Sequence, residues 1–432
     1  MVKHFDVIVV GAGLAGSAAA LTMSRSGLNV CLIERATSPG EKNVTGGVLY
    51  GRVLDDLITD WQNKAPVERW IVKNGIGMIT SKSLTLFQFE TEDFYNPPYN
   101  SCTINRANFD LWLAQQAEEA GATLVTNTLV EDLIFKDGYV KGVKTQRPDG
   151  ELEADIVICA DGVNSLLAQK AGLRKKDISP HEVGIGIKEV LLLPIEKINE
   201  RFGLEENQGS AYEFIGTFLN CVHGGAFLYT NKKTLSLGIV VNLGSLQKAA
   251  VQPSMLLEEF KGQPQIQKFI EGGTLVEYSA HMVPEIGLEM VPKLYGNGVM
   301  VAGDAAGFVV TNGFTFEGMN YALASGKAAG HTAVLAMKNG DVSAKALAAY
   351  QDKINESFIG KNLETYRKVY HVLGNPRLRQ EYPQIIEEIA KELFLFDDKP
   401  RIKLAKMVRS VVGNKVSMWQ VIRDGIDMWR YM

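Results

Sequence analysis

Three glycines and one acidic residue near the start of the sequence have the spacing of a nucleotide site. Gly11, Gly13 and Gly16 form the pattern GxGxxG, and Glu34 follows at the end of the next apolar run. Backbone without side chains can approach a pyrophosphate closely, and the start of a helix offers N–H groups with partial positive charge. Glu34 is then placed to accept hydrogen bonds from ribose hydroxyls, and its charge argues against a 2′-phosphate.

Two later segments place the same residue types after an apolar run. The segment ADIVICADG (154–162) ends in an Asp-Gly turn, and GVMVAGDAAG (298–307) contains Gly-Asp followed by small residues. An extended cofactor could rest on the bare backbone of the first, and Asp304 in the second could accept hydrogen bonds from a ribityl chain. Simpler roles also fit, because Asp161 could cap a turn and Asp304 could cap a helix. The GxGxxG pattern alone does not separate FAD from NAD, whereas the three segments together favour FAD.

The glycine pattern lies within a predicted strand–helix–strand unit. Residues 5–10 are typical of a buried parallel strand, 14–26 of an alanine-rich helix ended by Gly27, and 29–34 of a second buried strand. A strand, a helix, a strand and a terminal acid in this order make a dinucleotide site a much stronger interpretation than the glycines alone.

The rest of the sequence predicts further α/β structure, then a change of pattern, then helices. Residues 52–100 have a mixed pattern that predicts no element. The other predicted elements are a helix at 105–120, strands at 123–127, 129–135, 140–146 and 155–160, alternating strands such as 235–242 with a helical piece at 255–270, a buried strand at 299–302, a small-residue helix at 318–337, and mostly helices after 339.

Length and charge restrict the classes of function. At 432 residues the chain exceeds one ordinary core, since domains usually have roughly 100 to 200 residues. With 45 basic and 49 acidic residues, the net charge of -4 gives no overall field that would attract nucleic acid or an anionic membrane. The four cysteines are scattered, without CxxC or metal-spaced histidines, so neither a metal site nor an iron–sulfur cluster is expected in this chain.

The N-terminus and the hydropathy predict a cytoplasmic protein. The stretch MVKHFDVIVVGAG has a short apolar run that leads directly into a glycine turn, unlike a signal peptide. No stretch approaches the roughly 18 uncharged apolar residues of a membrane-spanning helix. Contact with a membrane, such as the inner face of the cell membrane, would therefore be peripheral.

The order of these segments resembles that of flavoproteins of the glutathione-reductase structural class. Within it, the chain resembles the electron-transfer-flavoprotein:quinone oxidoreductases, and above all the nitrogen-fixation-associated FixC-type proteins, from about residue 3 through the C-terminal region. The segments that carry this resemblance are EKNVTGGVLY (41–50), SAHMVPEIGLEMVPKLYGNGVMVAGDAAG (279–307) and GMNYALASGKAAG (318–330). The GxGxxG pattern and the Asp-Gly turn are shared by the whole class and are less specific.

The resemblance implies an α/β fold with FAD as the cofactor. It implies a discontinuous Rossmann-like FAD-binding domain (1–177 and 294–338), an inserted α+β domain for substrate or quinone (178–293) and a helical C-terminal region (339–432). The residues that it assigns to FAD are Gly11, Ala12, Gly13, Leu14, Ala15, Gly16, Glu34, Arg35, Thr45, Gly46, Gly47, Arg106, Val130, Ala160, Asp161, Gly162, Gly303, Asp304, Gly318, Met319 and Asn320.

Some of these assignments have simpler alternatives. Arg106 matches an arginine near the cofactor but also fits a surface ion pair at a helix start. Val130 would offer backbone to adenine, although an apolar strand residue also fits the core. Thr45, Gly46 and Gly47 would lie near the isoalloxazine ring, and a plain turn fits them as well.

The helix that begins near Gly318 should direct its N-terminus at the flavin. Met319 and Asn320 would offer N–H groups to flavin N1 and O2, and positive potential there would favour the anionic reduced flavin and raise its reduction potential. No catalytic side chain is assigned, because electrons that arrive and leave one at a time need no acid or base.

The resemblance also implies protein partners. Longer members of the family carry a four-cysteine cluster domain at the C-terminus, whereas no cysteine follows Cys221 here. In the FixC-type branch a small ferredoxin-like iron–sulfur protein supplies the cluster and a two-subunit electron-transfer flavoprotein delivers electrons. A multi-subunit complex that sends electrons toward membrane quinone, as the high-potential arm of flavin-based bifurcation, is therefore expected. The sequence has no second GxGxxG pattern before an acidic strand end, so direct oxidation of NADH is not expected.

Two surfaces have open interpretations. The apolar runs at 214–222, 226–229 and 282–290 could admit a quinone or could be core strands. The C-terminal region could lie on lipid or on a partner subunit, or expose a solvated helical face. Its residues of interest are Lys403, Lys406, Arg409, Lys415, Trp419 and Trp429.

Other functions fit the same scaffold. The main alternative is a geranylgeranyl-reductase-type enzyme, which uses FAD to add hydrogen across the double bonds of an isoprenoid lipid. A flavin monooxygenase and a flavin-bearing structural subunit without a redox role are further alternatives.

Overall fold

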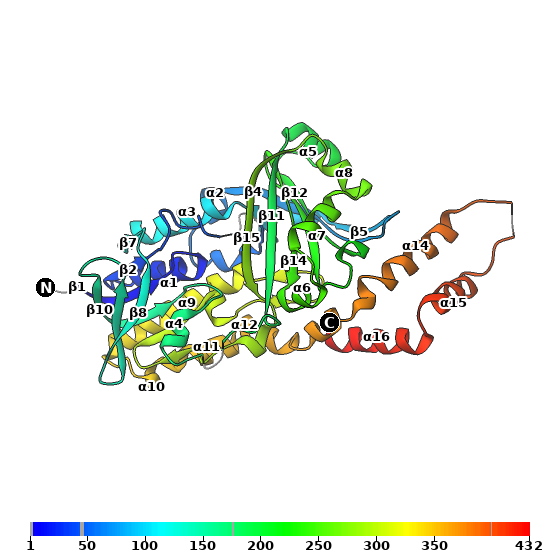
Figure 1. Cartoon of the computed structure of the whole chain (residues 1–432). Helices are drawn as coiled ribbons and strands as arrows, with labels where there is room; N and C mark the ends of the chain where they lie inside the picture. The colour runs from blue at the N-terminus through cyan, green and yellow to red at the C-terminus, as the bar shows by residue number, and fades with distance from the viewer. Residues whose placement is uncertain (1–2, 44–46, 175–176, 399) are drawn as a thin grey trace.

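The computed structural model of the chain describes residues 3–43, 47–174, 177–398 and 400–432. It contains two large β-sheets. In Figure 1 the first sheet lies toward the N-terminal end, the second stands in the middle, and helices from the C-terminal part project on the far side.

The first sheet is built on parallel strands. Strand β1 (Lys3–Val10) pairs in parallel with β2 (Val30–Ile33) on one side and with β10 (Glu151–Cys159) on the other. Strands β7 (Thr123–Val125) and β17 (Val299–Val301) extend it in parallel, which gives the order β16-β17-β10-β1-β2-β7. All four residues of β2 are buried, as expected where helices cover both faces of a sheet.

An antiparallel hairpin completes this sheet. Strands β8 (Val130–Lys136) and β9 (Tyr139–Thr145) pair with each other, and β9 pairs with β10. The short strand β16 (Tyr295–Gly296) closes the other edge. The positions of the predicted strands at 5–10, 29–34, 123–127, 129–135, 140–146, 155–160 and 299–302 are thereby confirmed, within a few residues at their ends.

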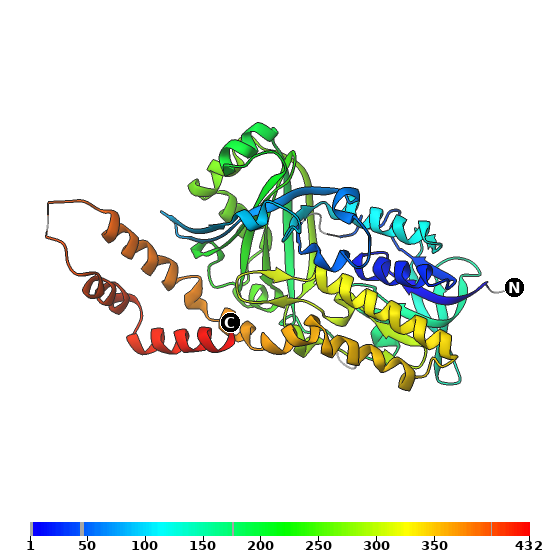
Figure 2. The same ribbon diagram turned by 180° about the vertical axis from the view of Figure 1, so that it is seen from behind.

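Two small-residue helices pack against each other beside the first sheet. Helix α1 (Leu14–Arg25) and helix α9 (Met319–Asn339) run side by side, blue and yellow in Figure 2. A Cβ atom on Gly326 of α9 would lie 2.0 Å from the Ala15 carbonyl oxygen, and one on Gly330 would lie 2.9 Å from the Ala19 carbonyl oxygen. Only glycine permits this approach, which fixes the starts of both helices relative to each other.

The second sheet is larger and mostly antiparallel, in the order β15-β11-β14-β13-β12-β4-β6-β3 with β5 paired to β4. Its strands are β3 (Gly47–Leu49), β4 (Val67–Ile79), β5 (Leu84–Glu90), β6 (Cys102–Ile104), β11 (Val183–Leu192), β12 (Gln208–Gly216), β13 (Gly224–Thr230), β14 (Thr234–Asn242) and β15 (Thr274–Pro284).

This sheet joins two distant parts of the chain. Strand β12 pairs in parallel with β4, so residues 47–104 complete the sheet of the segment predicted as an insertion at 178–293. The sequence grouped residues 47–104 with the first domain, because pairing between distant strands leaves no mark on local periodicity.

Helices cover one face of the second sheet. Helices α5 (Ile195–Phe202), α7 (Pro253–Lys261) and α8 (Pro264–Ile270) pack on it through a continuous apolar cluster. The helical piece predicted at 255–270 is two helices. Pro264 lacks an N–H and suits the first turn of a new helix, so the chain turns between α7 and α8.

The remaining elements are short, and many lie in the helical C-terminal part. The α-helices are α2 (Trp61–Lys64), α3 (Arg106–Glu119), α4 (Leu166–Lys170), α6 (Leu243–Ala249), α10 (Ala344–Leu347), α11 (Ala349–Glu356), α12 (Phe358–Thr365), α13 (Val369–Leu373), α14 (Glu381–Phe394), α15 (Leu404–Lys415) and α16 (Met418–Tyr431). The 3-10 helices are η1 (Gly51–Leu54), η2 (Glu92–Phe94), η3 (Thr217–Leu219), η4 (Gly287–Met290), η5 (Gly303–Ala306) and η6 (Pro376–Leu378), and β18 (Val310–Thr311) pairs with β19 (Phe316–Glu317).

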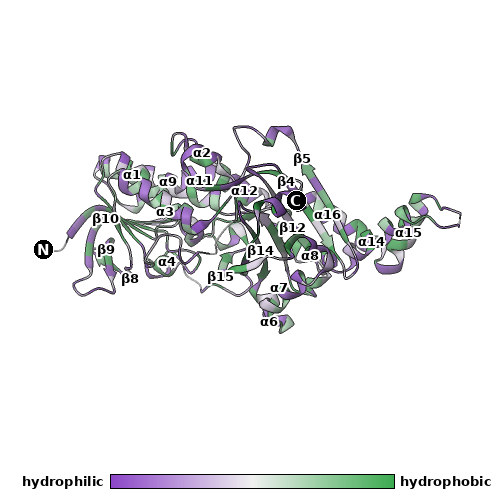
Figure 3. Cartoon of the chain, turned by 90° about the horizontal axis from the view of Figure 1, so that it is seen from above, coloured by the Kyte–Doolittle hydropathy of each residue, from purple (hydrophilic) through white to green (hydrophobic). Residues whose placement is uncertain are grey.

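Helices α14, α15 and α16 form a projecting arm. It leaves the body along α14, turns back through α15, and returns to the body along α16 (Figure 1). Apolar and polar residues alternate along these helices in Figure 3. Trp419 and Trp429 on α16 are 78% and 88% exposed. Among the described residues, no helix combines the length and the apolar character needed to cross a membrane.

Candidate functional site

The glycine turn between β1 and α1 has two kinds of glycine. Gly11 has a φ of 102°, and a Cβ atom there would lie 2.2 Å from the Ala160 carbonyl oxygen. A Cβ atom on Gly16 would lie 1.8 Å from the Gly11 carbonyl oxygen. Gly13 differs, because no atom lies within 4 Å of its Cβ position. Gly11 and Gly16 therefore allow the tight turn, and Gly13 leaves open space at the start of α1.

The start of α1 is free to bind an anion. Its N-cap is Gly13, no side chain caps it, and the first turn, which contains Leu14 and Ala15, carries no acidic residue. The unsatisfied N–H groups and the helix dipole there favour a negatively charged group such as a pyrophosphate.

Glu34 is held at the end of β2 by the backbone on both sides. Its Oε2 atom accepts from the Ala12 N–H at 2.9 Å and its Oε1 atom from the Ala36 N–H at 2.9 Å, and the residue is 9% exposed. Each carboxylate oxygen keeps a second lone pair that can accept from a hydroxyl group. The next residue, Arg35, is exposed.

Val130 lies near this acid. The Thr128 N–H donates to the Glu34 carbonyl oxygen at 2.9 Å, which brings the start of β8 to the end of β2. Val130 itself is 8% exposed and belongs to the main apolar core. Its position fits contact through its backbone, and its side chain is a core residue, as the alternative expected.

The Asp-Gly turn after β10 meets the glycine turn. The Ala160 N–H donates to the Val10 carbonyl oxygen at 2.9 Å. The Asp161 Oδ2 atom accepts from the Leu167 N–H at 3.1 Å, at the start of α4, while its Oδ1 atom is buried and accepts no hydrogen bond from the described residues. Burial raises the pKa of the Asp161 carboxyl group. Asp161 therefore caps a helix and keeps one free acceptor, and no atom lies within 4 Å of the Cβ position of the adjacent Gly162.

The third segment packs between α1 and α9. Gly303 has a φ of 66°, its Cβ position lies 2.7 Å from the Ala15 Cβ atom, and its N–H donates to the Ser325 Oγ atom at 3.0 Å. Burial raises the pKa of the neighbouring Asp304 carboxyl group, and the charge of Arg106 opposes this. Within the described part of the chain, no hydrogen bond from a helix N-terminus reaches this carboxyl group, so the capping alternative for Asp304 is not observed.

Arg106 begins helix α3 and makes an ion pair there. It donates to both Asp110 carboxylate oxygens, at 2.7 and 2.8 Å, and the Asn43 side chain donates to Asp110 at 2.7 Å. The Arg106 side chain is only 19% exposed and Asp110 is fully buried. The pair therefore lies inside the protein beside Asp304. The alternative expected an ion pair at the start of the helix, which is present, but at the surface, where it does not lie.

Two basic residues near Arg106 were not predicted from the sequence. Lys188 of β11 is fully buried, its Nζ atom lies 3.9 Å from Glu277 Oε1, and burial lowers its pKa to about 7. His281 of β15 has a lowered pKa because of burial and the charges of Arg106 and Arg35. A lysine inside the apolar run GIGIKEV was the available signal. Burial therefore leaves His281 neutral and Lys188 only partly charged near neutral pH.

The start of α9 faces β3. A Cβ atom on Gly47 would lie 3.3 Å from the Met319 Cε atom, and the N-cap Gly318 has no side-chain cap. Asn320 is 6% exposed; its Nδ2 atom donates to Glu317 at 2.8 Å and its Oδ1 atom has no partner among the described residues. Thr45 and Gly46, predicted near the isoalloxazine ring, lie outside the described residues.

These groups fit an extended FAD molecule. Three glycine-bearing segments and the starts of two helices lie together, with uncapped N–H groups for the pyrophosphate and the flavin. Buried carboxyl groups with free lone pairs, on Glu34, Asp161 and Asp304, can accept from ribose and ribityl hydroxyls. The individual contacts to FAD remain predictions.

Comparison with known protein families matches three models to successive parts of the chain. They are described as FAD dependent oxidoreductase (residues 6–174), ETF-QO, ubiquinone-binding (183–283) and ETF-QO/FixC family C-terminal domain (369–432). The protein FixC of Escherichia coli K12 is 44% identical over 98% of this chain and 97% of its own length. This chain belongs to the ETF-QO/FixC family.

Other relatives support the same family. The FixC of Azotobacter vinelandii is 38% identical over 100% of this chain and 99% of its own length. A probable electron transfer flavoprotein-quinone oxidoreductase of Escherichia coli, YdiS, is 43% identical over 98% and 97%. The predicted resemblance to the ETF-QO/FixC family is therefore confirmed.

Solved structures share the fold at low identity. A geranylgeranyl bacteriochlorophyll reductase-like protein of Thermoplasma acidophilum superposes with a TM-score of 0.73 at 18% identity, covering 99% of both chains. The flavin-dependent brominase Bmp2 gives 0.64 at 16% identity, also covering 99% of both chains. The predicted α/β flavoprotein fold is confirmed. FAD is the cofactor, and the chain is an FAD-dependent oxidoreductase that acts in electron transfer to quinone.

The ubiquinone-binding match of this ETF-QO/FixC chain covers most of the predicted quinone runs. In the run 214–222, Phe214, Phe218 and Leu219 belong to the apolar core beneath the helices. In β13, Ala226 and Leu228 face the same core, whereas Phe227 and Tyr229 alternate to the opposite face. The run 282–290 spans the end of β15 and η4. These runs are thus largely core, and Phe227 and Tyr229 lie on the face opposite the helices.

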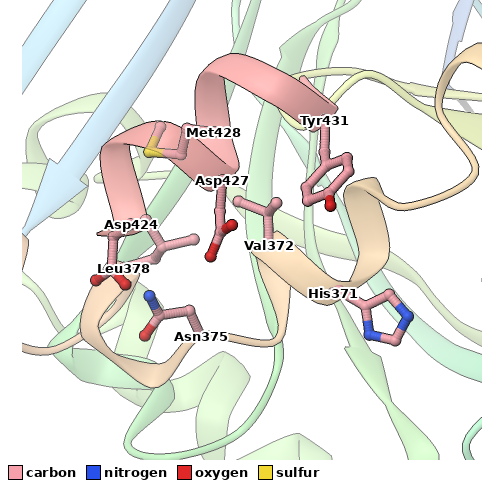
Figure 4. Close-up of a pocket in the computed structure, with 8 residues that line it drawn as sticks. All are labelled: His371, Val372, Asn375, Leu378, Asp424, Asp427, Met428 and Tyr431. Carbon is pink, nitrogen blue, oxygen red and sulfur yellow. The ribbon is translucent and has the colours of Figure 1, made fainter. Parts of the chain in front are cut away.

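A separate pocket of the ETF-QO/FixC chain lies between its C-terminal helices. It has a volume of about 110 Å³ and none of the predicted FAD residues lines it. In Figure 4, Asp424, Asp427, Met428 and Tyr431 of α16 face residues of α13 and the following turn. This pocket belongs to the attachment of the arm.

Proposed function

We propose that this chain is the FAD subunit that passes electrons from a two-subunit electron-transfer flavoprotein toward membrane quinone. The observation that carries the proposal is similarity along the whole length to FixC, with the ubiquinone-binding match at residues 183–283. We place the chain in a FixABCX-like complex that contains a small ferredoxin-like iron–sulfur protein and acts as the high-potential arm of electron bifurcation.

The residue content supports an external cluster. No cysteine follows Cys221, and Cys31, Cys102 and Cys159 are buried in the apolar core. An iron–sulfur cluster needs several cysteine thiolates together, so a partner protein is the natural source of the cluster.

The starts of α1 and α9 give the chain two roles toward FAD, which supplies the two-electron redox chemistry when bound. The uncapped start of α1 is placed to neutralise the pyrophosphate. The uncapped start of α9, at Met319 and Asn320, is placed to stabilise negative charge on the reduced ring and so to raise its reduction potential.

The projecting arm is the proposed contact with partners at the inner face of the cell membrane. It exposes Phe394, Phe396, Trp419 and Trp429, each at least 78% exposed. Lys403, Lys406 and Arg409 add positive charge on the same arm. Exposed aromatic and basic residues together suit a peripheral membrane or protein contact.

Reconstitution tests the proposal. The purified chain with bound FAD should reduce a quinone analogue when a purified electron-transfer flavoprotein supplies electrons, and native purification should recover the flavoprotein subunits and the iron–sulfur protein. Simultaneous reduction of a low-potential ferredoxin would support bifurcation. The isoprenoid reductase alternative, which shares the fold of the Thermoplasma protein, would replace the proposal if the chain reduced a prenyl double bond without a partner flavoprotein.

A further inference from the structure

An acidic and phenolic cluster lies on the face of the second sheet that is turned away from its covering helices. Glu213 of β12 and Tyr229 of β13 form its centre, and the Tyr229 hydroxyl group donates to Glu213 Oε1 at 3.5 Å. Their strand neighbours Phe214 and Leu228 face the apolar core on the other side of the sheet. Glu213 and Tyr229 therefore share the face opposite the covering helices.

Glu213 is an uncompensated carboxyl group. Among the described residues it has no ion pair, and its only hydrogen-bond donor is Tyr229. Its strand-pair neighbours are Ile76 on β4 and Phe227 on β13, which are apolar. Burial raises the pKa of Glu213 to about 8, and the Tyr229 hydrogen bond lowers it only in part. At neutral pH the group holds a proton, because charge without a partner is costly in such a site.

Further polar groups connect this pair to the start of α9. Tyr50, the residue directly after β3, has a pKa raised by burial and by the charges of Glu213 and Glu317. Glu317 accepts from the Asn320 side chain at 2.8 Å, and burial raises its pKa. Glu213, Tyr229, Tyr50 and Glu317 are each partly exposed, and the cluster extends from the sheet toward the start of α9, where the flavin ring is predicted to lie.

We propose that Glu213, oriented by Tyr229, gives a proton to the quinone as it is reduced beside α9; this inference rests on the proposed function. Reducing a quinone to a quinol takes two electrons and two protons. FAD, when bound and reduced, would supply the two electrons and one proton, and the neutral Glu213 carboxyl group would supply the second proton. The Glu213 carboxylate then regains a proton from water, with Glu317 and Tyr50 as intermediate groups.

A purely structural role explains these residues less well. A glutamate kept for stability is normally paired or hydrogen-bonded several times, since a carboxyl group that is even partly buried without a partner lowers stability. Glu213 has a single long hydrogen bond instead. Strongly perturbed titratable groups of this kind gather at functional sites.

The test is the oxidative half-reaction of the reduced holoprotein, which needs no partner flavoprotein. Reoxidation by a quinone analogue, which takes up protons, is compared with reoxidation by ferricenium, which takes up electrons only. The variant Glu213→Gln should slow the quinone reaction by about 10²-fold more than the ferricenium reaction. The control Glu206→Gln makes the same change at an exposed position just before β12 and should leave the ratio of the two rates unchanged.

Two pH measurements provide a readout beyond that rate. The quinone rate of the unmodified protein should fall as pH rises through about 8, where Glu213 loses its proton, and Glu213→Gln should lack this fall. Infrared titration of the holoprotein should show a carboxyl band that disappears over the same range, in the unmodified protein and in Glu206→Gln but not in Glu213→Gln.

The outcomes separate the two proposals. Equal slowing of both half-reactions in Glu213→Gln, or an unchanged infrared titration, would overturn the proton role and leave the proposed function standing. A holoprotein that ferricenium reoxidises but no quinone analogue does would overturn the proposed function itself, and the proton role with it.

Discussion

At the scale of single residues, several predicted FAD contacts also hold the protein together. Glu34 orients the glycine turn through two backbone N–H groups, and Asp161 caps the start of α4. Arg106 is paired with a buried aspartate. The simple and the functional interpretations therefore coexist at these positions, because a residue held rigidly by the backbone is also one that can orient a ligand.

Glu34→Gln should weaken FAD binding by about 1 to 3 kcal/mol. The glutamine has one acceptor oxygen, so either the Ala12 or the Ala36 N–H would face an amide group that cannot accept, and the ribose hydroxyls would lose a charged acceptor. Flavin fluorescence during titration of the apoprotein measures the change. Glu131→Gln, an exposed acid on β8, is the control, and equal FAD affinity in both variants would contradict the predicted role of Glu34.

At the scale of elements, the predictable parts are those that local pattern determines. Strand β1, helix α1 and strand β2 follow from an apolar run, a glycine turn and an alanine-rich stretch, and all three were predicted within a residue or two at their ends. The strands of residues 47–104 were missed because β4 pairs in parallel with β12, far along the chain. Lys188 and His281 were missed for the same reason, since only the pairing of β11 with β15 brings them together beside Arg106.

The site also has residues that local pattern reveals and residues that only the pairing of distant strands brings together. Motif residues around α1 could be located from the sequence, because glycines and terminal acids mark their own turns. The Glu213 and Tyr229 cluster could not, because its members come from separate strands and only the sheet register shows that they share a face. Residues 255–270 gave one helical pattern, yet Pro264 starts a second helix there.

The contact of α1 with α9 yields a prediction about an element. Gly326→Ala would place a Cβ atom 2.0 Å from the Ala15 carbonyl oxygen. The helices would have to separate, at a cost of about 1 to 3 kcal/mol, and the starts of α1 and α9 would move away from the flavin. The melting temperature and the FAD content of the purified protein should both fall.

Gly413→Ala is the matched control for this helix contact. Gly413 lies in α15 with no atom within 4 Å of its Cβ position, so alanine there should be neutral or stabilise by up to about 1 kcal/mol. If Gly326→Ala kept both its melting temperature and its FAD, the close contact of α1 with α9 would not be what positions the site.

At the scale of the whole molecule, a buried ion pair joins the returning helix of the arm to the body. Arg377 in η6 donates to both carboxylate oxygens of Asp424 in α16, each at 2.6 Å, and the Tyr382 hydroxyl group donates to Asp424 at 2.6 Å. Burial opposes the charge on Asp424, but these hydrogen bonds outweigh it and lower its pKa to about 2. The arm, which we propose to contact partners, is thus fastened by charge as well as by apolar packing.

The depressed pKa fixes how attachment of the arm depends on pH. Asp424 titrates near 3.8 when unpaired and near 2 in the structure, so its ion pair contributes fully above about pH 4 and is lost as the pH falls toward about 2. The contribution is about 2 kcal/mol. The protection of the α16 amides against hydrogen exchange, corrected for the intrinsic rate at each pH, should therefore fall in acid before protection in the first sheet does.

Asp424→Asn should produce the same loosening at neutral pH. The charge is lost while the shape is kept, and a contribution of about 2 kcal/mol corresponds to roughly 30-fold faster amide exchange in α16. Asp427→Asn on the same helix is the control, because Asp427 lines the adjacent pocket (Figure 4) without an ion pair among the described residues. Both variants should keep their FAD, since the predicted cofactor residues lie outside this pocket. Unchanged exchange in Asp424→Asn would mean that apolar packing alone fastens the arm, and loss of FAD would mean that the arm supports the cofactor site from a distance.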